Sequence, residues 1–143
     1  MAFSAIIKPT DYFNTKLYTG TDNSNAITGL NFQPDFTWIK MSSSTASHAL
    51  QDAVRGNDKT FRTNNTNAQY TNSFFSSFNS DGFTVATSET DANADGSTYA
   101  SWNWKANGAG SANTTGSINS TVSANTTSGF SIVSYTGNGT SGA

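Results

Sequence analysis

The chain has 143 residues, a net charge of −2 at pH 7, no cysteine and 34% hydrophobic residues, among them ten Phe, five Tyr and three Trp. Its scattered Lys and Arg residues exclude a phosphate-binding surface, the absence of cysteine excludes thiolate metal sites, and no apolar run approaches the roughly 20 residues of a membrane-spanning helix. Disorder usually combines few aromatic residues with high net charge, so the composition predicts a folded all-β chain with an aromatic core and a neutral polar surface.

Short alternating segments, separated by Asn, Gly and Asp turns, predict β-strands along the whole chain. In chain order they are residues 12–19, 36–41, 49–54, 59–63, 74–78, 83–87, 98–105, 117–123 and 130–136. We predict an antiparallel two-sheet sandwich at 11–106, preceded by an N-terminal anchor segment at 1–10. A flexible joint at 107–116 leads to a C-terminal strand pair at 117–143.

The segment at 36–41 has apolar side chains on both faces. Phe36 and Trp38 point one way, while Ile39 and Met41 point the other. This pattern is typical of a central strand in a sandwich, and Pro34 just ahead of it fits a strand that begins there.

The segment at 98–105 alternates cleanly and carries two of the three tryptophans. Trp102 and Trp104 share a face with the small Ala100, which favours packing of both rings in the core. Tyr99 points to the opposite, polar side. Aromatic side chains also form sugar-binding platforms, and Trp38, Trp102, Trp104 and Tyr99 could together form one. Because the core is favoured for Trp102 and Trp104, Tyr99 is the candidate glycan contact.

The end of the chain repeats its beginning. The sequence FNTKLYTG at 13–20 aligns with FSIVSYTG at 130–137, an offset of 117 residues (130 − 13). Similarity at a fixed period is typical of tandem arrays, so 117–143 is interpreted as the start of a second repeat. Two explanations remain open: the polypeptide continues past Ala143, or the last strand docks onto a neighbouring subunit.

His48 is the only histidine, and Asp52 and Arg55 follow it closely. Acid–base chemistry is one interpretation, but no local motif marks a nucleophile. We favour a structural role, in which Asp52 and Arg55 form an ion pair that pins the loop before Gly56 and His48 is hydrogen-bonded nearby.

The segment Asp91–Gly96 superficially resembles the start of a calcium loop. The acidic residue expected at the twelfth position is missing, because Trp102 stands there. A solvated turn is the favoured interpretation, and a weak surface calcium site that includes Glu89 is the alternative. Glu89 is also the only glutamate, so no carboxylate pair recommends a glycosidase. We therefore expect no enzyme, no cofactor and no resident metal.

Several motifs in this order resemble repeat-type domains of structural proteins of marine tailed phages, known as tail fibre or head fibre proteins. The matching strings are residues 13–20, 29–40 (GLNFQPDFTWIK), His48, 52–56 (DAVRG), 80–85 (SDGFTV) and 99–106 (YASWNWKA). The resemblance covers nearly the whole chain and implies a lectin-like β-sandwich of the jelly-roll or concanavalin type. Such proteins commonly carry further copies of the repeat, so the short length leaves fibre and capsid decoration both open.

The resemblance also implies a function on the surface of a virus particle. We expect a virion structural protein that serves in particle architecture and host-surface attachment. The alternative is a carbohydrate-binding, lectin-like module that recognises host surface glycans. Other virion proteins would bind through the N-terminal segment, which is apolar at Phe3, Ile6 and Ile7, and we expect a homo-oligomer. Nucleic acid and membrane insertion are not expected.

Overall fold

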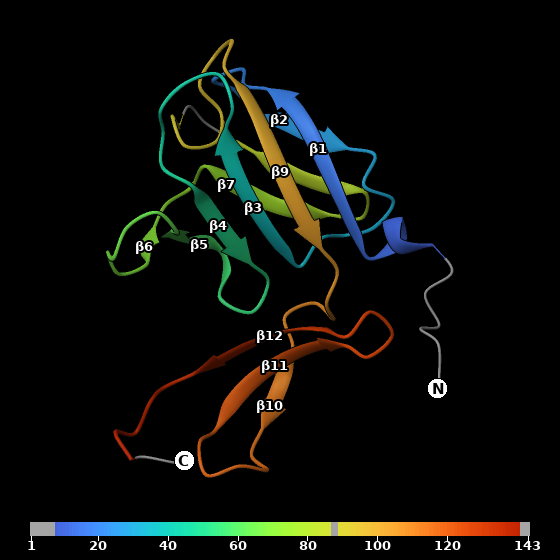
Figure 1. Ribbon diagram of the computed structural model, residues 1–143, viewed down its shortest axis with the longest axis vertical. Coiled ribbons are helices and arrows are strands. Elements are labelled where there is room, and N and C mark those ends of the chain that lie inside the picture. The colour runs from blue at the N-terminus through green and yellow to red at the C-terminus, as the bar shows by residue number, and fades with distance from the viewer. Residues whose placement is uncertain (1–7, 87–88, 141–143) are drawn as a thin grey trace.

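The computed structural model describes residues 8–86 and 89–140, and in these ranges nearly all regular structure is β-strand (Figure 1). A single 3₁₀ turn, η1 (Pro9–Asp11), precedes the strands. The strands are β1 (Phe13–Thr19), β2 (Asn25–Thr28), β3 (Phe36–Met41), β4 (Ala49–Asp52), β5 (Gly56–Arg62), β6 (Tyr70–Thr71), β7 (Phe75–Asn79), β8 (Gly82–Val85), β9 (Thr98–Trp104), β10 (Ser111–Asn113), β11 (Ser120–Asn125) and β12 (Phe130–Tyr135). No helix in the described part of the chain is long and apolar enough to cross a membrane.

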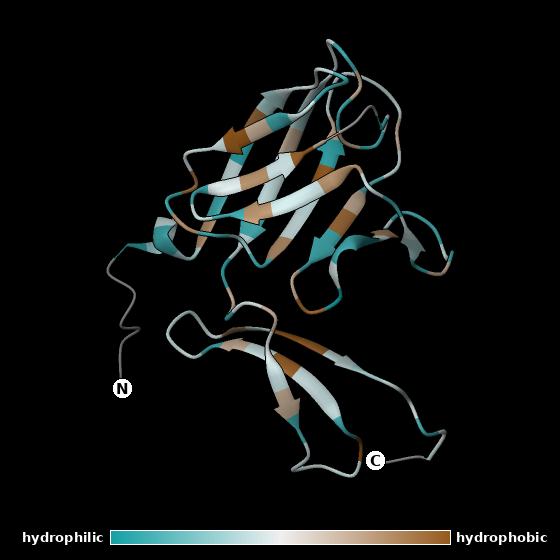
Figure 2. Ribbon diagram, turned by 180° about the vertical axis from the view of Figure 1, so that it is seen from behind, coloured by the Kyte–Doolittle hydropathy of each residue, from teal (hydrophilic) through white to brown (hydrophobic). Residues whose placement is uncertain are grey.

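Two antiparallel sheets make up the main body. One has six strands in the order β1-β9-β3-β4-β5-β6, and the other has three in the order β2-β8-β7. The smaller sheet lies behind the larger one in Figure 1, and hydrophobic and hydrophilic residues alternate along most strands in Figure 2. The predicted all-β antiparallel sandwich is thus confirmed. Strands β2, β6 and β10 were not predicted, because each is only two to four residues long and lacks a clear apolar alternation.

The core lies between these sheets and is rich in rings. The fully buried side chains include Phe75 and Phe83 from the smaller sheet, whose stacked ring centroids are 5.4 Å apart. The larger sheet contributes Ile39 and Tyr99, both with no exposed surface. Burying a side chain of this size stabilises the fold by roughly 1.5–3 kcal/mol relative to leaving it in water.

The inward face of strand β9 is the reverse of the predicted one. Tyr99, Ser101 and Asn103 are completely buried, whereas Trp102 and Trp104 are only half-buried on the opposite face. The predicted core positions of the two tryptophans and the predicted open position of Tyr99 are therefore wrong. Strand alternation shows which residues share a face, but the partner sheet decides which face is covered.

The C-terminal strands form a separate three-stranded sheet, β10-β11-β12, beside one end of the sandwich (Figure 1). The predicted pair at 117–143 is present as β11 and β12. Strand β10 lies within the predicted joint at 107–116. Gly110 fixes the entry into this strand: its φ is +77°, and a Cβ there would lie 2.6 Å from the carbonyl oxygen of Val122. A backbone so close to β11 leaves room only for glycine.

Most of the predicted anchor segment at 1–10 lies outside the described residues. This includes Phe3, Ile6 and Ile7. Lys8, Pro9 and Thr10 are described, and all three are exposed at the start of η1.

Candidate functional site

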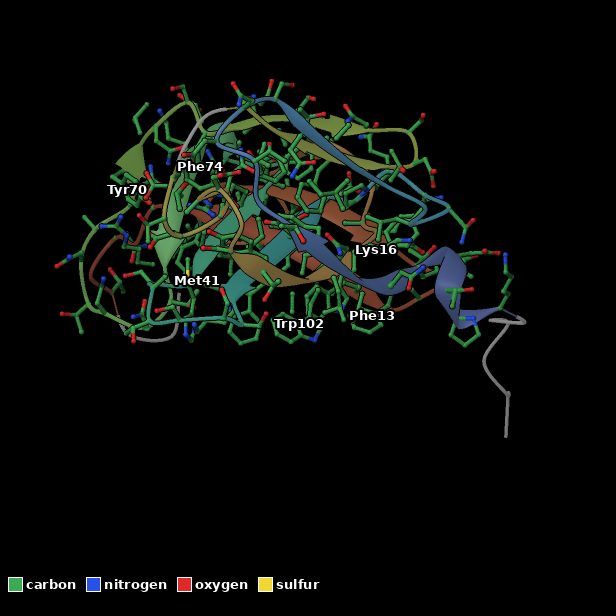
Figure 3. The ribbon with its side chains drawn as sticks, turned by 90° about the horizontal axis from the view of Figure 1, so that it is seen from above. Phe13, Lys16, Met41, Tyr70, Phe74 and Trp102 are labelled. Carbon is green, nitrogen blue, oxygen red and sulfur yellow. The ribbon has the colours of Figure 1, made fainter. Side chains whose placement is uncertain are left out.

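The six-stranded sheet carries large aromatic side chains on the side that faces away from the core. They are Phe13 on β1, Phe36 and Trp38 on β3, and Trp102 and Trp104 on β9, and we call this surface the outer aromatic face. Figure 3 views the layers end-on and shows Phe13 and Trp102 on this outer side. Contiguous exposed apolar surface on a soluble protein commonly marks an interaction site.

The rings of this face contact one another across neighbouring strands. The register places Trp38 opposite Trp102 and Phe36 opposite Trp104, and the ring centroids of each pair are 5.3 Å apart. Phe13 lies opposite Trp104 on the other side, with a centroid distance of 4.8 Å. Each ring is held by cross-strand neighbours, so the face is preorganised and loses little side-chain entropy when a ligand binds.

A groove of about 650 Å³, which we call the tryptophan groove, opens on this face. Its lining residues are Phe36, Trp38, His48, Leu50, Thr63, Asn64, Trp104 and Phe130. Phe130 comes from β12 and stacks at a centroid distance of 6.0 Å from Trp104, so the C-terminal sheet forms one wall. The volume falls within the roughly 300–1,000 Å³ of small-molecule sites.

Polar atoms stand at the rim of the tryptophan groove. The indole Nε1 of Trp38 donates a hydrogen bond of 3.0 Å to Thr63 Oγ1, which fixes the plane of the ring. The His48 ring lies beside Trp38 at a centroid distance of 5.9 Å. The side-chain oxygen of Asn64 accepts the backbone N–H of His48 at 3.1 Å, which leaves the Asn64 amide NH₂ without a partner among the described residues.

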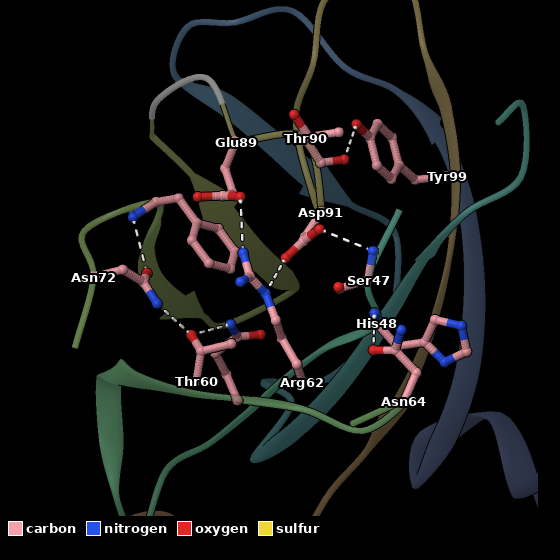
Figure 4. A network of polar contacts seen from close by, with 12 residues as sticks. Ser47, His48, Thr60, Arg62, Asn64, Asn72, Glu89, Thr90, Asp91 and Tyr99 are labelled. Atoms are coloured by element: carbon pink, nitrogen blue, oxygen red, sulfur yellow. Dashed lines mark hydrogen bonds and ion pairs between the residues drawn. The ribbon is translucent and has the colours of Figure 1, made fainter. Parts of the chain in front are cut away.

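A network of polar contacts behind the rim holds these residues in place (Figure 4). Asp91 is buried, and its carboxylate accepts the backbone N–H of Ser47 at 3.0 Å and Arg62 Nε at 2.7 Å. The hydrogen bond to Asp91 raises the pKa of Arg62 above its ordinary value. Arg62 also lies 3.7 Å from Glu89. This network fixes the chain at Ser47 and Arg62, immediately before His48 and Thr63 of the groove.

The structure joins Asp52 and Arg55 but not His48. Arg55 Nε donates to Asp52 Oδ2 at 2.6 Å, and the backbone N–H groups of Val54 and Arg55 donate to Asp52 Oδ1 at 3.1 and 2.9 Å. This geometry closes the turn between β4 and β5. The His48 side chain instead contacts Trp38, so its predicted place in the loop pin is corrected to the rim of the groove.

Two other predicted positions also need correction. Tyr99 cannot contact a glycan, because its side chain has no exposed surface. The turn at 91–96 is solvated only in its second half, since Asp91, Ala92 and Asn93 are buried while Asp95 and Gly96 are exposed. The Asp91 carboxylate is taken up by Arg62 and Ser47. Among the described residues, no group of three or more His, Cys, Asp or Glu side chains could hold a metal ion.

Several residues of the site were missed by sequence reasoning. Phe36 was predicted only as part of one face of a strand, and no binding role was predicted for Thr63 or Asn64. One sequence feature could have pointed to this surface: small polar residues alternate with the rings, such as Thr37, Ser101 and Asn103. Which of the two sets is buried depends on partners far away in sequence.

No curated protein and no solved structure matches this chain. A family model described as "Domain of unknown function (DUF7483)" matches residues 8–143, and the chain therefore belongs to this family.

Proposed function

We propose that the chain is a non-catalytic attachment module of a phage particle, which binds glycans of the host surface through its outer aromatic face. The observation that carries the glycan role is the reversed polarity of the six-stranded sheet. Its tryptophans are open to the outside, while Thr37, Ser101 and Asn103 occupy the core. Burial of such rings would stabilise the fold, so their exposure favours a role in binding.

Sugar rings suit this surface for chemical reasons. The C–H face of a pyranose packs on a flat aromatic ring, and its hydroxyl groups need hydrogen-bond partners at the edge of that ring. The tryptophan groove offers both, with the Trp38 ring as floor and the Asn64 amide and His48 ring at the rim. The particle setting rests on the resemblance to marine phage structural proteins, and the neutral polar exterior suits display at high copy number.

Binding to a panel of bacterial surface polysaccharides tests the glycan role. Trp38→Ala should weaken binding at least about tenfold, which corresponds to roughly 1.4 kcal/mol. Trp38→Phe keeps a ring and should retain part of the affinity. Leu17→Ala is the matched control, because Leu17 is 81% exposed on β1 and does not line the tryptophan groove. Equal binding by the wild type and Trp38→Ala, with near-ultraviolet circular dichroism unchanged, would overturn the proposal.

The particle setting needs a separate test. An antibody against the chain should label the surface of purified virus particles in electron micrographs. Absence of the chain from particles would overturn the virion role. The glycan role would then depend on the binding experiment alone. The contact to other virion proteins is assigned to residues 1–10, and deletion of this segment should abolish incorporation.

A second candidate function is assembly with another subunit through β12. The repeat aligns Tyr135 with Tyr18, yet their surroundings differ. Tyr18 stacks on Tyr99 and donates a hydrogen bond to the carbonyl oxygen of Ala92, whereas Tyr135 is 65% exposed. Strand β12 is also an edge strand, because no other strand of the described ranges pairs with its outer side. If β12 drives assembly, Val133→Lys should reduce the oligomer to monomers in light scattering.

A further inference from the structure

A second groove continues the tryptophan groove along the seam between the sandwich and the C-terminal sheet. It measures about 410 Å³, and we call it the arginine groove. Its lining residues are Phe36, Leu50, Asp52, Arg55, Phe61, Ile132, Val133, Ser134 and Tyr135. The two grooves share Phe36 and Leu50, so they are adjacent sections of one elongated site.

Both sections offer aromatic surface to a ligand. In the arginine groove, Phe61 is 39% exposed and Tyr135 is 65% exposed. In the tryptophan groove, Trp38 and Phe36 are half-buried. Alternating rings and polar edges over the whole length match a chain of several sugar units better than a single one. The floor is made by the six-stranded sheet and the far wall by β12.

The charge of the lining residues selects against acidic ligands. Among the described residues that line the two sections, Asp52 and Arg55 are the only Asp, Glu, Lys or Arg side chains. They neutralise each other at 2.6 Å, and the guanidinium also lies 4.0 Å from the centre of the Phe61 ring. One N–H of each terminal nitrogen reaches Gln69 Oε1 and the carbonyl oxygen of Leu50, at 3.3 and 3.4 Å. Because Asp52 already neutralises this guanidinium and only 12% of the Arg55 side chain is exposed, the arginine offers little attraction to a carboxylate or a phosphate.

We propose that the two sections together bind a linear, neutral oligosaccharide of at least two pyranose units. This inference rests on the proposed glycan-binding function and adds the charge and the length of the ligand. One unit stacks in the tryptophan groove beside Trp38 and Asn64. The following units extend over Phe36 and Leu50 into the arginine groove, where Phe61 and Tyr135 are the stacking rings.

Isothermal titration with two matched sugar series tests this proposal at pH 8. The first series contains neutral gluco-, manno- and galacto-oligosaccharides of one to four units, and the second contains galacturonate oligomers of the same lengths. For at least one of the three neutral sugars, affinity should rise at least about tenfold from one unit to three. Galacturonate oligomers should bind at least about tenfold more weakly than oligomers of that neutral sugar.

Variants separate the two sections. Trp38→Ala should lose binding of short and long chains alike. Tyr135→Ser should reduce the affinity for three units to about that of one unit, and it should leave the single sugar unaffected. Tyr135 is largely exposed, so this change should not disturb folding, and Leu17→Ala serves as the control in which nothing changes.

Each outcome distinguishes the two proposals. Affinity that does not depend on length, an equal or better fit of the acidic series, or normal binding of long chains by Tyr135→Ser would overturn this inference. If the wild type binds acidic sugars and Trp38→Ala loses that binding, the neutral-oligosaccharide inference is overturned while the proposed glycan-binding function is supported. If no sugar of either series and no surface polysaccharide binds, both proposals are overturned.

Discussion

Tyr18 and Tyr99 stack against each other on neighbouring strands, with ring centroids 5.2 Å apart and planes inclined by 17°. Both hydroxyl groups bind the segment that follows residue 89. Tyr18 donates to the carbonyl oxygen of Ala92 at 2.7 Å, and Tyr99 donates to the carbonyl oxygen of Thr90 and accepts the N–H of Ala94, both at 2.9 Å. The two rings thus fasten this segment to the six-stranded sheet, behind the rim of the tryptophan groove.

Tyr99→Phe should destabilise the protein by about 1–3 kcal/mol, because it removes two part-buried hydrogen bonds, to the carbonyl oxygen of Thr90 and from the N–H of Ala94. Tyr99→Ala should cost about 3–5 kcal/mol, since a cavity is added. Urea unfolding followed by circular dichroism measures both. At a temperature at which Tyr99→Phe remains folded, its glycan affinity should equal that of the wild type. Specific loss of affinity in a folded Tyr99→Phe would contradict the buried role.

Tyr18 should make the protein less stable above pH 10. Burial, and secondarily the neighbouring Tyr99, raises the pKa of Tyr18 well above its ordinary value. Below pH 10 the residue is neutral in both the folded and the unfolded state, and its contribution is fully present. As the pH rises further, only the unfolded state ionises, so stability falls by up to about 1.4 kcal/mol per pH unit until the folded pKa is reached.

The comparison with Tyr18→Phe isolates this effect. At pH 8 the variant should be about 1 kcal/mol less stable, because the carbonyl oxygen of Ala92 loses its donor. Above pH 10 its free energy of unfolding should fall less steeply than that of the wild type. The free energy of unfolding is measured by urea titration from pH 8 to about pH 11.5. If it falls equally steeply with pH in the wild type and in Tyr18→Phe, Tyr18 is not the cause of the alkaline destabilisation.

The sequence predicts the strands of this protein better than it predicts their faces. Alternation correctly separated Tyr99 from Trp102, because side chains along a strand point to opposite sides. It could not show which side is covered, since Tyr99 owes its burial to Tyr18 and to the segment at 90–94. Hydrophobicity alone favoured the tryptophans as core. The outer aromatic face therefore depends on the position of the second sheet, which alternation within one strand does not reveal.

The Asp52–Arg55 pair could be predicted, because both residues lie in one short turn and depend on local geometry. Their side chains are only 5% and 12% exposed, so Arg55→Met should leave a buried carboxylate unpaired and cost about 2–3 kcal/mol. Asp52→Asn/Arg55→Met should recover part of this loss, and urea unfolding of the four proteins gives the coupling energy. Lys8→Met is the control, because the Lys8–Asp11 pair is exposed and should contribute less than about 1 kcal/mol. Additive effects of Asp52→Asn and Arg55→Met would contradict the coupling.

A row of polar side chains crosses the core side of the six-stranded sheet, where Asn103, Thr37 and Gln51 lie opposite one another on β9, β3 and β4. All three are fully buried, and Asn103 Oδ1, Thr37 Oγ1 and Gln51 Oε1 have no hydrogen-bond partner among the described residues. Two carbonyl oxygens and one hydroxyl match the needs of a single water molecule, which would donate to both amide oxygens and accept from Thr37.

We expect a high-resolution crystal structure to show one ordered water bonded to these three oxygens. Thr37→Val replaces the hydroxyl by a methyl group of similar size and should destabilise the protein by about 1 kcal/mol, because the water loses its donor. Thr37→Ser keeps the hydroxyl and should retain the water, although it gives up one buried methyl group. If the two amide oxygens instead bond directly to protein groups and Thr37→Val is neutral, the row is satisfied without water and this prediction is wrong.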